Sequence, residues 1–146
     1  MYETILVPLD GSKRAEDILP HVEELSKSSS AKIIFLQVIE SAPPAVGPEV
    51  ADLEIYQKML NQLSEASKTY LAELQDAFSK KRIDSDSCVT HGSIVEQIIK
   101  TADREGADLI AIASHGRTGL SRVFYGSVAA GILHRIDRPL LIIRSV

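Results

Sequence analysis

A glycine-rich polar loop interrupts the apolar pattern of residues 110–128, which read IAIASHGRTGLSRVFYGSV. The loop contains Gly116, Gly119 and Gly126, and the pair Gly126-Ser127 stands where a helical pattern resumes. The free N–H groups and the dipole at a helix N-terminus attract anions. Glycine lets an anion approach the backbone, and the Ser127 hydroxyl can donate to a phosphate oxygen. The spacing predicts a phosphate cradle, with a helix cap and glycine turns as the alternative.

The charge of the chain is distributed unevenly around this loop. The whole chain has a net charge of -4, and residues 1–112 hold 11 Lys and Arg against 19 Asp and Glu. Residues 113–146 hold five Arg against one Asp. This basic part favours an anionic small molecule, although a solvated basic surface explains the charge equally well. Because nucleic acids need a wider basic face, we expect no nucleic-acid partner.

The composition is typical of one soluble globular domain over residues 1–146. The chain is 45% hydrophobic and 25% charged, and it is long enough to bury a core without staples. No apolar run approaches the ~18 residues that a membrane span needs, and the N-terminus lacks the features of a signal peptide. The lone Cys88 has no partner for an internal disulfide. We expect a cytoplasmic protein that does not enter a membrane, with Cys88 as a packing residue.

Short apolar segments alternate with helical patterns along the chain. Four helices are expected near residues 15–25, 50–80, 94–102 and 128–136, with Ser12 as N-cap of the first and Pro20 kinking it. The second carries an apolar stripe, and residues 41–49, SAPPAVGPE, form a surface loop before it. The alternation predicts an α/β fold, an open doubly wound parallel sheet with helices on both faces. The expected strands are Thr4–Leu9, Lys32–Ile39, Asp86–Thr90, Asp108–Ala113 and Pro139–Ile143.

In such sheets a ligand binds beyond the carboxyl ends of the strands, where the strand order reverses. Polar residues gather at these ends in the sequences PLDGS after the first strand and THGS after the third. The glycine-rich loop follows the fourth strand. Neither a P-loop nor a Gly-x-Gly-x-x-Gly motif occurs, which removes the main support for a standard NTPase or a dinucleotide dehydrogenase.

Nearly the whole chain resembles the universal stress protein family. The resemblance is carried by ILVPLDGS, QVIE, the HG before the third helix, ADLIAIASHGRTGL, GSVA and RPLLII. Nucleotide-binding members of the family carry Gly-x2-Gly-x9-Gly-Ser/Thr, and here Gly116, Gly126 and Ser127 match its last three positions. Ala113 replaces the first glycine and adds one methyl where the family's backbone passes close to the ligand.

The resemblance implies strand order 3-2-1-4-5 and a bound adenine nucleotide, ATP or AMP, with Mg²⁺ as a companion ion. It implies that Pro8 and Leu9 flank the adenine, that the Val38 backbone bonds its edge, and that Asp10 contacts the ribose or the cation. For Asp10 a role in an Asp-Gly turn is the alternative. The residues implied at the ribose and the phosphates are Ile112, Ala113, His115, Gly116, Arg117, Gly126, Ser127, Val128 and Ala129.

We expect a regulatory stress-response protein whose ligand is held by the loops after the first and fourth strands. An efficient phosphoryl-transfer site needs a positioned base and dedicated metal ligands, and these loops offer one carboxylate, Asp10. The alternatives are a slow ATPase or nucleotide hydrolase using a metal at Asp10, and a family member that acts through protein contacts without a nucleotide. Ala113 keeps the last alternative open.

The last expected strand bears on assembly. Its apolar segment Leu140–Ile143 ends the chain at a sheet edge, which pairs or aggregates unless it is covered. The resemblance implies that the same strand of a second copy covers it in antiparallel orientation. We therefore expect a homodimer with two-fold symmetry.

Overall fold

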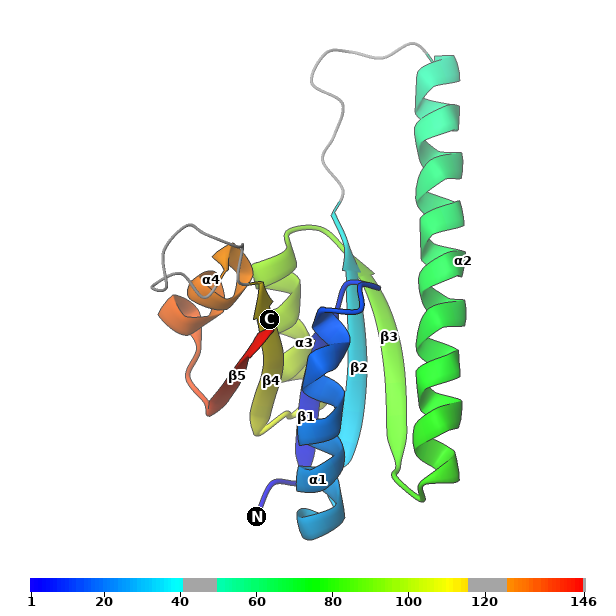
Figure 1. Cartoon of the computed structure of the whole chain (residues 1–146). Helices are drawn as coiled ribbons and strands as arrows, with labels where there is room; N and C mark the ends of the chain where they lie inside the picture. Colours follow the sequence, from blue (N-terminus) through cyan, green and yellow to red (C-terminus); the bar gives the residue numbers. More distant parts are fainter. Residues whose placement is uncertain (41–49, 116–125, 146) are drawn as a thin grey trace.

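The structure, a computed structural model, describes residues 1–40, 50–115 and 126–145. Five parallel strands form one sheet in the order β3-β2-β1-β4-β5, and helices cover both faces (Figure 1). The doubly wound α/β fold and the strand order are therefore confirmed. The strands are β1 (Thr4–Leu9), β2 (Lys32–Ile39), β3 (Ser85–His91), β4 (Leu109–His115) and β5 (Leu140–Ser145).

Two apolar clusters, one on each face, hold the helices to the sheet. On the first face, α1 (Leu19–Ser29) and α2 (Val50–Lys80) cover residues such as Val7 and Phe35. On the second face, α3 (Ile94–Glu105) and α4 (Ser127–Arg135) cover residues such as Leu6 and Leu36. Successive residues of a strand point to opposite faces, so a sheet covered twice needs apolar residues at nearly every position. This is why the central strands are continuous apolar runs.

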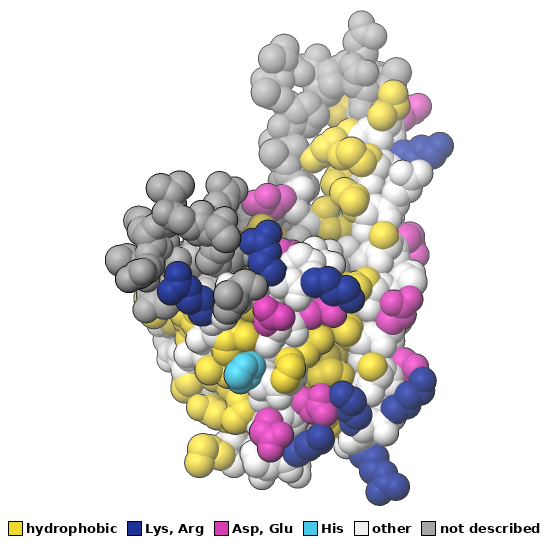
Figure 2. Space-filling view, in the orientation of Figure 1, with side chains coloured by type: hydrophobic (Ala, Val, Ile, Leu, Met, Phe, Trp, Pro, Cys, Tyr) yellow, Lys and Arg dark blue, Asp and Glu magenta, His cyan; other side chains and the backbone are white. Residues whose placement is uncertain are grey.

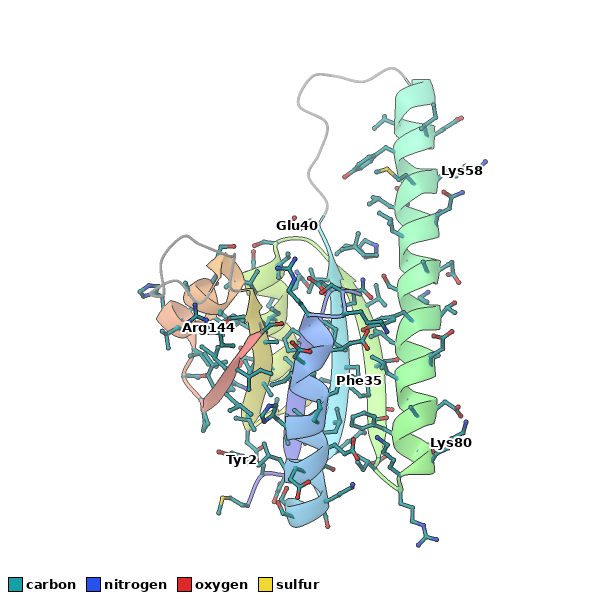
Figure 3. The ribbon with its side chains drawn as sticks, viewed as in Figure 1. Tyr2, Phe35, Glu40, Lys58, Lys80 and Arg144 are labelled. Atoms are coloured by element: carbon teal, nitrogen blue, oxygen red, sulfur yellow. The ribbon has the colours of Figure 1, made fainter. Side chains whose placement is uncertain are left out.

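Aromatic packing fixes α2 to the sheet near its C-terminal end. The rings of Phe35 on β2 and Phe78 on α2 meet edge to face, with centroids 5.0 Å apart and planes at 88°; Figure 3 shows Phe35 on the side of the sheet that faces α2. Such T-shaped pairs are favoured by the charge distribution of the rings.

Cys88 is partly buried against the cluster on the opposite face, where burial raises the pKa of its thiol. Its packing role agrees with the expectation from the sequence.

The first helix differs from the expectation in its start. A 3₁₀ turn, η1 (Ala15–Ile18), comes first, and α1 begins only at Leu19. Pro20 therefore lies in the first turn of α1 instead of kinking a longer helix, because a first-turn N–H needs no intrahelical acceptor. Ser12 is not the N-cap of η1, but its Oγ accepts a hydrogen bond from Ala15 N–H at 3.2 Å.

The apolar stripe of α2 is buried in the C-terminal half of the helix and exposed in the N-terminal half. In its C-terminal half Leu71 and Phe78 are buried, whereas Leu53 and Leu63 in the N-terminal half are 45% and 47% exposed. A helix of 31 residues spans about 46 Å, whereas the eight residues of β2 span about 26 Å. The helix therefore extends past the sheet (Figure 1) and exposes apolar side chains there (Figure 2).

The topology places the carboxyl ends of β1 and β4 next to each other. β1 pairs with both β2 and β4, and the chain leaves β1 toward one face and β4 toward the other. This is the reversal point of the sheet, where a crevice opens beyond the carboxyl ends of the strands. Within the described ranges, no helix combines the length and the apolar character needed to cross a membrane.

Candidate functional site

A cavity of about 850 Å³ lies at the carboxyl ends of β1, β2 and β4. Its size falls in the range of small-molecule sites, which are roughly 300–1,000 Å³. The structure brings together in its lining ten of the residues named from the sequence: Pro8, Leu9, Asp10, Val38, Ile112, Ala113, Gly126, Ser127, Val128 and Ala129. His115 ends β4, but its side chain lies outside what the structure describes, as do Gly116 and Arg117 entirely.

One part of the cavity wall is apolar. Leu36 and Val38 come from β2, Ile94 and Ile98 from α3, and Ile112 from β4. All five belong to the cluster on the α3 and α4 face or pack against it. A flat apolar group, such as a nucleobase, can replace water against these side chains and gain from the burial.

The N-terminus of α4 forms a polar part of the wall. Gly126 is the N-cap residue with φ +83° and ψ 151°, and no side chain in the described ranges caps the helix there. The first intrahelical bond runs from Ala130 N–H to Gly126 O at 3.0 Å. The N–H groups of residues 127–129 come before that bond, so the helix offers them no acceptor. Ser127 is the first helical residue and does not cap α4, which weakens the alternative drawn from the sequence.

Asp10 takes part in a turn as well as in the cavity wall. Its Oδ1 accepts a hydrogen bond from Ser12 N–H at 2.9 Å, and Gly11 between them has φ +86°. The turn role that the sequence left open is therefore present, beside the cavity contact. Within the described ranges, no group of three His, Cys, Asp or Glu side chains is placed to hold a metal ion. A cation at Asp10 would therefore need most of its ligands from a bound molecule or water.

The turn η1, which follows β1 in the chain, carries the charged residue Glu16. The Tyr70 hydroxyl on α2 donates to Glu16 Oε2 at 2.9 Å. Burial raises the pKa of Tyr70, and the carboxylates of Glu16 and Asp10 raise it further. The phenol therefore stays protonated and keeps donating to Glu16, which fixes η1 against α2.

Ala113, the departure from the family's glycine motif, belongs to the apolar cluster on the α1 and α2 face and is 8% exposed. It also lines the cavity. Along β4, Ile112 faces the α3 and α4 side, whereas Ala113 faces the side of α1. The extra methyl is therefore accommodated in a core on the face opposite to α4.

Seven lining residues were not named from the sequence. Ser114 follows Ala113 in β4 and is 3% exposed, and Arg14 and Ala15 lie in the segment after β1. The signal for Arg14 and Ala15 was their position just past the carboxyl end of β1, where ligands of such sheets bind. The other four are apolar residues of strands or helices, and their sequence pattern indicates only burial: Leu36, Ile94, Ile98 and Ala130.

Comparison with known proteins gives a consistent result. The profile of the universal stress protein family matches residues 1–144. Universal stress protein MJ0577 of Methanocaldococcus jannaschii is 26% identical, covering 99% of this chain and 96% of that protein. Universal stress protein Sll1654 of Synechocystis is 29% identical, covering 98% of this chain and 86% of its own length.

Solved structures share the fold over nearly the whole chain. The structure of MJ0577 superposes with a TM-score of 0.84 at 28% identity, covering 100% of this chain and 98% of that chain. A universal stress protein in complex with cAMP superposes with a TM-score of 0.67 at 23% identity, covering 97% of this chain and 96% of its own.

Proposed function

This chain belongs to the universal stress protein family, and from that premise we propose that it binds an adenine nucleotide, ATP or AMP, in the cavity beyond β1 and β4. The binding serves regulation of a stress response in the cytoplasm, and nucleic acid is not a partner. The observation that carries this proposal is the pairing, in one cavity, of an apolar wall with the N-terminus of α4 at Gly126.

The chemistry of the wall matches the parts of a nucleotide. The base lies against the apolar wall, with Pro8 and Leu9 beside it and the Val38 backbone at its edge. The phosphates lie at the α4 N-terminus, where N–H groups 127–129 and the helix dipole stabilise negative charge. Asp10, between the two, lies beside the ribose and any Mg²⁺ that the phosphates bring.

The other proposed contacts come from residues of β4 and α4. Ile112 and Ala113 run beside the ribose, and Val128 and Ala129 contribute N–H groups at the phosphates. His115, Gly116 and Arg117 complete the phosphate side. A solved member of the family holds cAMP, which is itself an adenine nucleotide. That likeness carries the fold alone, so the proposal for this chain rests on the cavity.

The identity of the ligand is testable directly. We expect freshly purified protein, denatured and analysed by mass spectrometry, to release ATP or AMP. Protein that releases no nucleotide, and to which neither ATP nor AMP binds in calorimetric titration, would contradict the proposal and favour a role through protein contacts.

Replacing Ser127 with alanine should weaken ATP binding by about tenfold. Ser127, the exposed first residue of α4, lines the cavity, and one hydrogen bond from its hydroxyl to a charged group is worth about 1 to 3 kcal/mol. Isothermal titration with ATP and Mg²⁺ measures the change. The matched control is Ser28→Ala, an exposed serine of α1 whose Oγ bonds Leu25 O, and its affinity should equal that of the wild type. Equal affinities for all three proteins would remove Ser127 from the site.

ATP turnover should be far below the ~1 per second at the low end of enzyme rates. Asp10 is the carboxylate of the described lining, and its Oδ1 is engaged by Ser12 N–H. A steady-state phosphate-release assay measures the rate for the wild type and for Asp10→Asn, which keeps an oxygen for the turn. Release at enzymatic rates that disappears in Asp10→Asn would favour the hydrolase alternative over the regulator.

A further inference from the structure

We propose that Arg14 is a second anion contact of the cavity and makes it selective for nucleoside di- and triphosphates over monophosphates and cyclic nucleotides. This inference rests on the proposed nucleotide function and adds the class of ligand. Arg14 is the N-cap residue of η1, its side chain is exposed, and it lines the cavity.

The turn that carries Arg14 is held firmly from several sides. Ala15 and Ile18 of η1 are buried in the cluster under α1. Glu16 accepts the bond from Tyr70 on α2, and Asp17 Oδ2 accepts one from Ser145 Oγ on β5 at 2.6 Å. Because three elements fix η1, Arg14 is presented from a rigid base, which lowers the entropic cost of a contact.

The carboxylates next to Arg14 are engaged by other residues, whereas the Arg14 guanidinium has no partner within the described part of the chain. Glu16 is bonded to Tyr70 and lies 3.8 Å from Lys13 Nζ, and Asp17 is bonded to Ser145. Arg14 makes neither a side-chain hydrogen bond nor an ion pair with the residues that the structure describes. A guanidinium offers up to five N–H donors in a planar fork that matches phosphate oxygens. An arginine that lines a cavity and has no partner among the described residues is therefore suited to an anionic group of the ligand.

The position of Arg14 relative to α4 indicates which anionic group it meets. η1 packs into the cluster on the α1 and α2 face, whereas α4 packs into the cluster on the α3 and α4 face. Arg14 and the α4 N-terminus therefore reach the cavity from opposite faces of the sheet, at the carboxyl ends of the strands. A first phosphate on the N–H groups of residues 127–129 lies at one side. A second and a third phosphate extend the ligand past the carboxyl ends of the strands toward Arg14. A single or cyclic phosphate does not reach that far.

The electrostatics of the described lining favour the same assignment. Asp10 and Arg14 are its charged residues, and Arg14 is the positively charged one. Each added phosphate brings more negative charge into a partly enclosed space of lowered dielectric, where an uncompensated charge is costly. Arg14 supplies compensation where a longer chain needs it.

The test compares Arg14→Gln with Lys13→Gln, because both remove one positive charge from adjacent residues. Lys13 is 96% exposed and is not part of the lining. Affinities for ATP, ADP, AMP, cAMP and adenosine are measured by isothermal titration at one salt concentration, with circular dichroism as a check on folding. We expect Arg14→Gln to weaken ATP and ADP by about tenfold or more, to change AMP and cAMP less than threefold, and to leave adenosine unchanged. Lys13→Gln should change all five less than threefold.

The outcomes separate this inference from the function on which it rests. If the wild type binds ATP and Arg14→Gln binds it equally well, Arg14 is no ligand contact, and the nucleotide proposal stands. If Arg14→Gln weakens ATP and AMP by the same factor, Arg14 contacts the first phosphate, and selection by chain length is wrong. If the wild type binds none of the five ligands, the proposed function fails, and this inference fails with it.

Discussion

Replacing Gly126 with valine abolishes ATP binding: this is the largest effect we expect at the site. The change acts in two ways at the N-terminus of α4. Gly126 has φ +83° and ψ 151°, a combination that is essentially confined to glycine and costs another residue about 1–3 kcal/mol, and a β-branched residue tolerates positive φ worst. The isopropyl group also adds bulk beside the N–H groups of residues 127–129, where the phosphate is proposed to lie. Isothermal titration with ATP and Mg²⁺ should detect no binding at ligand concentrations that saturate the wild type.

A second glycine of the chain provides the control for backbone strain. Gly106 also has positive φ, +65°, as the C-cap residue of α3, and nothing lies within 4 Å of an added Cβ. Gly106 precedes β4, so it lies at the amino end of the sheet, away from the cavity. Gly106→Val should lower the free energy of unfolding by about 1–2 kcal/mol and still bind ATP as the wild type does.

A complementary control removes side-chain volume from the cavity wall. Ala113→Gly restores the family's glycine, and because the Ala113 methyl packs in the cluster opposite α4, ATP affinity should stay within about threefold of the wild type. If a Gly126→Val protein that is folded by circular dichroism binds ATP like the wild type, the α4 N-terminus is not the phosphate site. The nucleotide proposal would then lose the observation that carries it.

The central strands were predictable because burial on two faces leaves a strong signal. β1 and β2 begin and end at the residues expected from their apolar runs. β4 and β5 each extend two residues beyond the expected ends, through Ser114-His115 and Arg144-Ser145. Polar residues at a strand end continue the backbone ladder without adding an apolar signal, so hydrophobicity marks such ends too early.

The helices show where a local pattern is ambiguous. Pro20 is compatible with a kink inside a helix or with the first turn of one, and only the packing of η1 decides for the second. The stripe of α2 indicates an amphipathic helix, but the length of the neighbouring strands determines how much of that stripe is covered. Neither the start of α1 nor the exposure of Leu53 and Leu63 follows from periodicity.

The candidate site also contains residues that the sequence predicts and one, Arg14, that it does not. The topology alone directs attention to the ends of β1 and β4, and residues adjacent to those ends line the cavity. Arg14 was missed because the direction of its side chain depends on η1, a 3₁₀ turn stabilised by bonds to Tyr70 and Ser145 far away in sequence. Contacts over such sequence separations leave no periodic signal.

The second large effect that we expect is a change of assembly from dimer to monomer when the edge strand β5 is disrupted. β5 ends the strand order of the sheet, and Leu140–Ile143 are all partly exposed. Ile110 pairs with Leu140, and Ile110 N–H donates to Pro139 O. In a parallel ladder this register turns the N–H groups of Leu140 and Ile142 away from β4, toward the open edge. These are the donors that the β5 strand of a second copy would use in the homodimer expected from the sequence.

Ile142→Pro should therefore convert a dimer into a monomer, or into a protein that precipitates, without removing a hydrogen bond between β4 and β5. Proline lacks the one N–H at this position that faces the edge. The Ile142 side chain packs against the cluster on the α3 and α4 face, so Ile142→Ala is the matched control: it loses a similar contact and keeps the N–H. Sedimentation velocity at micromolar concentration should show a dimer for the wild type and for Ile142→Ala, and a monomer or aggregate for Ile142→Pro. A wild type that sediments as a monomer, or an Ile142→Pro protein that stays a dimer, would exclude pairing through β5, because each outcome leaves the edge donors without a role in assembly.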